Sequence, residues 1–483
     1  GEGTSGTSTG NVIIKGGADN DFHSFNVAAG TITHSGSLTL DGGELLIGST
    51  EETRTNIDVE KADATLAMAS GSKLTIDNTK APNSIKVQSN GYGSTSTLDL
   101  SQLAKNIALK RGTNLTTVTV GTPTEEGTDL HAPIDAILKL NTSSDLLDLD
   151  KQTVDPNQQG LAVVLTGNGA LEMVGQNATL DVANIDGHST TAQSDKVIFS
   201  GGGIIMGQDF TLTNQDTAQN KELDLGGGTI WAEKLHLDND YIDASAPDKT
   251  NNLVLATGKI VVGQELTSTS NEIQIGTGSA YDETDPRSKT PAEVHLGYFT
   301  AQERGSHIVD PDSMSAQQGY VHGNIVVAGD VPLPDYTDDE AHDEFGRGHV
   351  KTNASLHVDQ GNWVVTDPTG TPAQDQTYAL GDVEIQNGGF LEVGGRNSAD
   401  EIYTRLEESN TRPGEQVEVV KGLALLQGDR LYNNHGIITV HANGGLIFNS
   451  YDEVYGSFFE SRGGEVHFNG VGEDGKPINP DTN

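Results

Sequence analysis

Carboxylates crowd into two short segments of this chain, and one of the segments adds a histidine. The first runs from 337 to 345 (TDDEAHDEF) and the second from 238 to 243 (DNDYID). Carboxylate oxygens are hard ligands that suit Ca²⁺, and the segment that adds an imidazole is by ligand type a plausible site for a divalent cation. The candidate metal ligands are Asp338, Asp339, Glu340, His342, Asp343, Asp238, Asp240 and Asp243. Ca²⁺ is the one cofactor that the sequence suggests. A solvated acidic loop is the competing interpretation of both segments, so no cofactor is required.

Catalytic motifs are weaker than these acidic segments. The pattern GxGxxG at Gly1, Gly3 and Gly6, and the pattern GxSxG around Ser8, lack the strand and helix that give such patterns their function. The chain has no cysteine, and its 14 histidines are scattered with no Ser-His-Asp spacing, so most histidines are expected on the surface. We therefore predict no catalytic residue, no cofactor-binding residue and a protein that is not an enzyme.

A β-helical polysaccharide lyase or glycoside hydrolase is the alternative function, since paired carboxylates a few ångströms apart can cleave a glycosidic bond. A lyase that acts on uronates needs cationic groups, and this chain has 28 Lys plus Arg against 69 Asp plus Glu. The two tryptophans, Trp231 and Trp363, lie in alternating segments. We expect both to pack within the fold or to lie on a strand surface rather than to form a sugar-binding platform.

The elements that must position these residues are short strands. A phrase of glycines and alternating apolar residues recurs as GGELLIG (42–48), GGGIIMG (201–207), GGFLEVGG (388–395) and GGEVHFNG (463–470). Alternation between glycine turns indicates strands with one buried face, and many imperfect copies indicate a solenoid. Aliphatic residues two positions apart are predicted to point inward, including Val12, Ile14, Leu45, Ile47, Val182, Val254, Ile438, Val440 and Val466.

The predicted fold is all-β, a single-stranded parallel β-helix that runs through residues 1–483 as one continuous β-solenoid. Tandem β-sandwich domains are the alternative, because the spacing of the phrases is irregular. Four stretches that lack the repeat are predicted to be loop insertions, at about 141–160, 281–318, 332–349 and 397–415. In the last of these stretches Ser398 is expected to cap a short helix. Long loops on a regular scaffold are where binding residues usually lie.

The charge of the chain excludes several classes of partner. Its formal net charge is −41, so nucleic acids and anionic membranes, which need a positive protein surface, are not expected to bind. No apolar run approaches the ~20 residues of a membrane span, and we expect no membrane insertion of this segment. The opening segment GEGTSGTSTG carries neither a basic stretch nor an apolar signal core, which predicts a mature product or an excised segment.

Two longer phrases carry a family resemblance. LYNNHGIITVHANGGLIFNS (431–450) combines an Asn-Asn-x-Gly turn with two alternating strands, and SGSLTLDGGELLIGS (35–49) has the same style. Together with the acidic, glycine-rich and cysteine-free composition, they resemble the secreted passenger regions of Gram-negative autotransporters and large surface adhesins. The resemblance implies a right-handed parallel β-helix that is exported across the outer membrane and located at the cell surface or outside the cell.

The expected function is structural and adhesive. We expect a rigid acidic rod, displayed outside a Gram-negative cell, that mediates cell adhesion or self-association in a biofilm or matrix filament. Its expected partners are host or bacterial cell-surface glycans or proteins, or copies of itself in a homo-oligomer or filament. The ends of a solenoid expose strand edges that a second copy can extend. The negative charge opposes such contacts until salt or divalent cations relieve the repulsion.

Overall fold

The computed structural model describes the chain in a series of ranges. They are 6–15, 24–27, 30–48, 64–79, 81–89, 95–103, 106–122, 134–141, 159–174, 178–181, 185–187, 196–213, 222–238, 253–279, 290–297, 318–329, 353–367, 379–394, 404–408, 416–420, 424–441, 443–462 and 464–468. Within these ranges every regular element is a β-strand, so the prediction of an all-β fold is confirmed. Nor does this part of the chain hold a helix with the length and apolar character of a membrane span.

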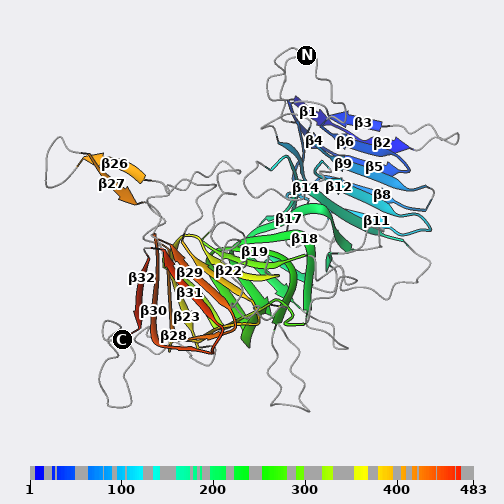
Figure 1. The fold of residues 1–483 in the computed structure, drawn as a ribbon. Coiled ribbons are helices and arrows are strands. Elements are labelled where there is room, and N and C mark those ends of the chain that lie inside the picture. Colours follow the sequence, from blue (N-terminus) through cyan, green and yellow to red (C-terminus); the bar gives the residue numbers. More distant parts are fainter. Residues whose placement is uncertain are drawn as a thin grey trace, which may run out of the picture. The chain divides into compact units, whose positions relative to one another are not determined.

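The chain divides into two compact units, and each is described by itself. Unit 1 comprises Gly1–Thr211 and Leu225–Ala232, and unit 2 comprises Leu212–Asp224 and Glu233–Asn483. Strand β18 (Glu222–Asp238) contributes residues to both units. Both units are built from parallel strands stacked coil upon coil, as a parallel β-helix requires (Figure 1). Whether the coils form one continuous solenoid through all residues stays a prediction.

Unit 1 contains three rows of parallel strands, and successive coils of the chain add one strand to each. Row A holds β1 (Gly6–Thr9), β4 (Gly30–Ser35), β7 (Ala64–Met68), β10 (Ser96–Asp99), β13 (Ala136–Asn141) and the second half of β14 (Leu161–Val174). Row B holds β3 (Ser24–Val27), β6 (Glu44–Ile47), β9 (Asn83–Val87), β12 (Thr116–Val120), the first half of β14 and the start of β17 (Lys196–Thr213). Row C holds β2 (Val12–Lys15), β5 (Ser37–Asp41), β8 (Lys73–Asp77) and β11 (Ile107–Lys110). The shorter β15 (Ala178–Asp181) and β16 (Ile185–Asp186) pair with β17.

Unit 2 repeats the three-row plan. Row D holds residues 258–262 of β19 (Leu253–Ile275), then β20 (Ala292–Leu296), β22 (Ala354–Val358), β25 (Phe390–Val393), β29 (Ile437–His441) and β31 (Phe458–Arg462). Row E continues from β19 through the start of β21 (Gln318–Ala328), β23 (Gly361–Thr366), β28 (Ala424–Asn434), β30 (Gly444–Glu453) and β32 (Glu465–Phe468). Row F links the end of β19 to the end of β21, β24 (Val383–Gln386) and the later halves of β28 and β30.

The interior of both units is filled by the aliphatic residues that alternate along the strands. Among the predicted inward residues, Ile14, Leu45, Ile47, Ile438 and Val440 are buried, whereas Val12, Val254 and Val466 are half-buried and Val182 lies outside the described ranges. Both tryptophans are buried, with exposed fractions of 8% for Trp231 and 1% for Trp363, as expected of packing residues. Period-2 alternation therefore located the core correctly.

Glycines in the recurring phrase stand where successive coils come closest. Gly48 has a φ of +102°, and a Cβ atom placed on it would lie 1.7 Å from the carbonyl oxygen of Gln88 in the next coil. Outside those phrases, Gly297 directly follows β20, has a φ of +80°, and its Cβ would lie 1.8 Å from the carbonyl oxygen of Gln360. Both the left-handed backbone and the close approach exclude any side chain, so these glycines mark turns of the scaffold.

Two of the predicted insertions need correction. The stretch 281–318 contains strand β20, which pairs with β19 and β22 in row D. The stretch 397–415 contains β26 (Thr404–Glu408), which pairs antiparallel with β27 (Gln416–Val420), so the helix predicted after Ser398 is wrong over the described residues. Most of 141–160 and all of 332–349 lie outside the described ranges.

A buried amide cluster joins the turns of unit 1. The side-chain oxygen of Asn83 accepts a hydrogen bond from the backbone amide of Gly42 at 2.7 Å, and its amide nitrogen donates to Asn78 Oδ1 at 2.9 Å and to the carbonyl of Asp77 at 3.1 Å. Asn78 in turn donates to the carbonyl of Gly160 at 2.7 Å. Because Asn78 and Asn83 are 0% and 3% exposed, these bonds satisfy backbone groups that water does not reach.

Candidate functional site

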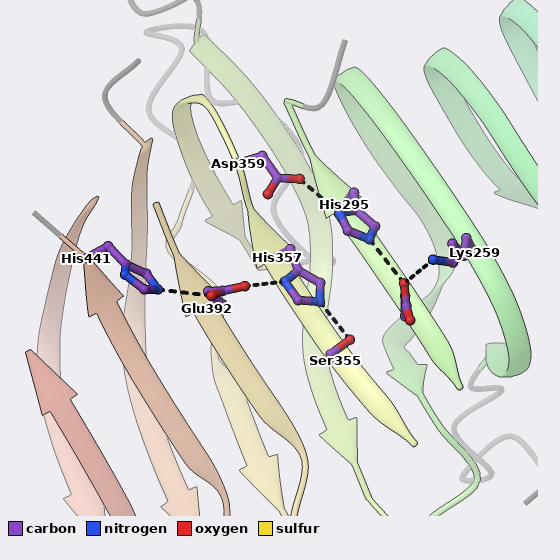
Figure 2. A network of polar contacts seen from close by, with 8 residues as sticks. Lys259, His295, Ser355, His357, Asp359, Glu392 and His441 are labelled. Carbon is purple, nitrogen blue, oxygen red and sulfur yellow. Dashed lines mark hydrogen bonds and ion pairs between the residues drawn. The ribbon is translucent and has the colours of Figure 1, made fainter. Parts of the chain in front are cut away.

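The outward side of row D carries a chain of polar side chains that is itself largely buried. Strands β20, β22 and β25 place His295 opposite His357, and His357 opposite Glu392, on successive coils. All five residues of β22 are buried, so this strand is covered on both of its faces. Figure 2 shows the resulting contacts. We call this group the row D network, and its members are Lys259, Glu293, His295, Ser355, His357, Asp359, Glu392 and His441.

One half of the network is an alternating chain of charges centred on His295. Its Nδ1 donates to Asp359 Oδ2 at 2.9 Å, and its Nε2 lies 3.4 Å from Glu293 Oε2, which also pairs with Lys259 Nζ at 2.8 Å. The side chains of His295 and Asp359 are only 6% and 5% exposed. Two cations and two carboxylates therefore neutralise one another with little help from water.

Burial and charge act in opposite directions on these groups. Burial by itself would lower the pKa of His295, but the carboxylates of Asp359 and Glu293 outweigh it and raise the pKa of His295 to about 9. Burial by itself would raise the pKa of Glu293. The hydrogen bond from His295 and the positive charge of Lys259 outweigh burial and hold the pKa of Glu293 well below its usual range. The imidazole of His295 is consequently charged at neutral pH.

The other half of the network is a hydrogen-bonded chain through His357. Its Nδ1 donates to Glu392 Oε2 at 2.9 Å, and its Nε2 lies 2.9 Å from Ser355 Oγ. The second oxygen of Glu392 accepts a hydrogen bond from His441 Nε2 at 2.9 Å. The rings of His295 and His357 stack with centroids 4.5 Å apart and planes 10° apart, which joins the two halves.

The order Ser355, His357, Glu392 has the connectivity of a hydrolase triad, in which histidine takes the serine proton and the acid orients the histidine. Burial opposes that chemistry here. Ser355 and His357 are only 6% and 5% exposed, and every residue of their strand is buried, so the Ser355 hydroxyl is hardly accessible to a substrate. The geometry therefore suits cohesion between coils better than nucleophilic catalysis.

Labelling with a fluorophosphonate probe tests this conclusion. Because Ser355 is only 6% exposed on a strand whose residues are all buried, we expect it to remain unmodified in the folded protein, with the same background in wild type and Ser355→Ala. Mass spectrometry of the peptide that contains Ser355 provides the measurement. Covalent labelling that disappears in both Ser355→Ala and His357→Gln would instead establish an activated serine.

The predicted metal ligands fall almost entirely outside the described ranges. Asp240 and Asp243 lie between 238 and 253, and Asp338, Asp339, Glu340, His342 and Asp343 lie between 329 and 353. Asp238 is the last residue of β18. In the portion of the chain that the structure describes, no group of three or more His, Asp or Glu side chains is arranged to hold a metal ion. A metal site in the two acidic segments stays a prediction.

Row F carries the carboxylates that come closest to the alternative function of a glycosidase. Burial raises the pKa of Glu272, and the neighbouring charge of Glu384 raises it further. Burial also raises the pKa of Glu384, although Arg430 and a hydrogen bond from Asn434 oppose the shift. Carboxylates with raised pKa values are typical of general acids, but they also occur wherever like charges crowd together on a sheet.

Sequence reasoning missed the row D network, because it placed most histidines on the surface, whereas His295 and His357 are each 5% exposed. A usable signal was present. The phrases AEVHL (292–296) and ASLHV (354–358) both set a histidine between two inward aliphatic residues. Aligning them with FLEV (390–393) puts His295, His357 and Glu392 in one column, as the strand register confirms.

Comparison with known proteins leaves the family open: the chain matches no family model, no curated protein and no solved structure.

Proposed function

We propose that this protein is an extracellular structural and adhesive surface protein of a Gram-negative bacterium. Its parallel coils serve as an acidic scaffold that presents loops and strand faces to cell-surface glycans or proteins, or to further copies of the chain. The resemblance to autotransporter-type passengers and large surface adhesins supports both the role and the location. No cofactor is needed for such a role, although bound Ca²⁺ is compatible with the acidic segments.

The observation that carries the proposal is that the buried polar groups bond successive coils to one another. The row D network reaches from Lys259 on β19 to His441 on β29. The amide cluster likewise ties Gly42, Asn83 and Gly160 of different coils in unit 1. Hydrogen bonds to charged groups, as in the row D network, each contribute about 1.5–3 kcal/mol, and neutral ones, as in the amide cluster, about 0.5–1.5 kcal/mol, so both networks favour a rigid scaffold.

Adhesion without turnover is the defining test. Beads coated with the protein are expected to bind cells or immobilised cell-surface glycans, while incubation with a panel of acidic and neutral polysaccharides releases no product. Beads coated with a cysteine-free protein of similar acidity provide the control for charge. Failure to bind any cell or glycan surface would contradict the adhesive role.

The alternative function of a glycosidase rests on the raised pKa values of Glu272 and Glu384. The same panel of polysaccharides distinguishes it from the adhesive role. Release of reducing ends that is lost in Glu384→Gln, and retained when a half-buried carboxylate of row D such as Glu460 is changed to Gln, would favour the enzyme. Equal and negligible product release from all three proteins would favour the scaffold.

Chelation is expected to lower the thermal stability of the protein or weaken its assembly. The net charge of −41 destabilises the folded chain through self-repulsion, and divalent cations held by the acidic segments would relieve it. Melting curves with and without excess chelator measure the effect. The variant Asp338→Asn, Asp339→Asn, Asp343→Asn should lose part of the response, and identical wild-type curves under both conditions would exclude a stabilising cation.

A further inference from the structure

Asp135 lies at a corner of unit 1, directly before strand β13 of row A. Its backbone amide donates to the carbonyl of Asn168 in the following coil at 3.3 Å. Its carbonyl accepts a hydrogen bond from the amide of Ser96 in the preceding coil at 2.9 Å. Hydrogen bonds to both neighbouring coils therefore fix the position of this residue.

The carboxyl group of Asp135 is buried without full compensation. Its Oδ1 is shielded from solvent and has no hydrogen-bond partner in the described structure. Burial raises the pKa of Asp135 from 3.8 to about 6, against hydrogen bonds from the amide and the hydroxyl of Thr122, which lower it. The charged form of this side chain is thus the form that the fold disfavours.

The strands that pack around Asp135 supply no counter-ion in their described parts. Strand β12 has no charged residue, and the charged residues of the others are Asp99 on β10, Lys139 on β13, Glu172 on β14 and Lys86 on β9. The first three are partners in register, and they lie four residues along their strands, about 13 Å from the level of Asp135. Lys86 forms an ion pair with Glu44 at 2.8 Å. No cation on these strands therefore offsets the burial of the carboxylate.

The hydroxyl of Thr122 links this carboxyl to the coil of β9. It donates to the carbonyl of Ser89, which follows β9, at 3.0 Å. A hydroxyl has one hydrogen and an ionised carboxylate only accepts hydrogen bonds, so charged Asp135 and the carbonyl of Ser89 compete for that hydrogen. A protonated carboxyl can instead donate to the oxygen of Thr122, which leaves the hydroxyl hydrogen for Ser89.

We propose that Asp135 is a proton switch of unit 1, which loosens this corner while its carboxyl is charged and tightens it when a proton neutralises the carboxyl. The bound proton removes a buried charge and completes a donor chain from Asp135 through Thr122 to the carbonyl of Ser89. Unit 1 is consequently held together more firmly in mildly acidic surroundings than at neutral pH. The inference goes beyond the scaffold role and does not depend on it.

The direction of the pH dependence follows from the difference between the folded and unfolded chain. Between pH 3.8 and about 6 the folded protein binds a proton that the unfolded chain has released. The contribution of Asp135 to stability is therefore complete below pH 3.8 and is lost as the pH rises through about 6. A shift of about two pKa units corresponds to a change of roughly 100-fold in the unfolding equilibrium constant.

Asp135→Asn tests the switch in the full chain, because the amide keeps the shape of the carboxyl and carries no charge. We expect the unfolding equilibrium constant of unit 1 to lie roughly 100-fold below that of wild type at about pH 7, and within a few-fold of it at about pH 4. Pulsed hydrogen exchange with mass spectrometry during denaturant unfolding measures unit 1 separately from unit 2. Glu172→Gln is the matched control, since it removes one carboxylate from row A and should not reproduce the gain.

Direct titration of the carboxyl provides a second measurement. Carbon-13 magnetic resonance of labelled aspartate carboxyls should show, in wild type, a resonance that titrates near pH 6. Its loss in Asp135→Asn or in Asp135→Ala assigns it. Stability curves of wild type and Asp135→Asn that stay parallel between about pH 4 and 7, or an Asp135 carboxyl that titrates near pH 3.8, would overturn the inference.

Discussion

Replacing Asn83 with alanine is expected to lower the free energy of unfolding of unit 1 by about 3 kcal/mol, because each buried polar group left without a partner costs about 1–3 kcal/mol. The substitution removes the acceptor for the amide of Gly42 and the donor to the carbonyl of Asp77, in a cluster that water does not reach, whereas Asn78 Oδ1 keeps its hydrogen bond from Thr116. Denaturant unfolding measures the loss.

Ser84→Ala is the matched control, since Ser84 is the next residue of β9 and is half-buried. Its effect should stay within about 0.5 kcal/mol, as for other partly exposed positions. Hydrogen exchange at the amide of Gly42 adds a local measurement that does not depend on cooperative unfolding. Unchanged protection of that amide in Asn83→Ala would show that the cluster does not hold the turn.

Removing the imidazolium from the row D network is expected to change how stability depends on pH. The pKa of His295 is raised from 6.5 to about 9 on folding, so its contribution is complete below pH 6.5 and is lost as the pH rises through about 9. At 1.36 kcal/mol per pKa unit, the shift corresponds to roughly 3 kcal/mol. His295→Gln should therefore lie roughly 3 kcal/mol below wild type at pH 6 and approach it near pH 10.

Asp359→Asn provides an independent check, because it leaves His295 in place and removes a carboxylate that raises its pKa. This variant should also show a flatter pH dependence between pH 6 and 9. Denaturant unfolding of unit 2 at several pH values is the measurement. Parallel curves for wild type and both variants would mean that His295 does not carry the linkage.

The sequence was sufficient to predict the interior of the fold but not the bonds between its coils. The inward direction of Leu45 and Ile47, or of Ile438 and Val440, can be predicted from two positions spaced by two on one strand. All four residues are buried. The row D network depends instead on which residues of different coils come into register. His295 and its partner His357 are 62 residues apart, and His357 and Glu392 are 35 apart. No single strand contains that information, which appears only when the phrases AEVHL, ASLHV and FLEV of different coils are aligned.

Strand β20 was missed because pairing between coils, which the local sequence does not show, decides its conformation. Prolines at 286, 291 and 311 favoured a long loop over 281–318. The phrase AEVHL is only five residues long, and its strand conformation is fixed by ladders to β19 and β22 on both sides. Tertiary pairing thus overrode a local signal for loop structure.

The uneven spacing of register partners in row D shows that added sequence between strands lowers the stability of this scaffold only slightly. Ile260 and Val294 are register partners 34 residues apart, whereas Val294 and Leu356 are partners 62 residues apart, yet the register is unbroken. For a flexible connection, closing the longer span costs only about 0.5 kcal/mol more, because the entropy of closure grows with the logarithm of length. The segments between strands can therefore change in length while the register of the coils is kept.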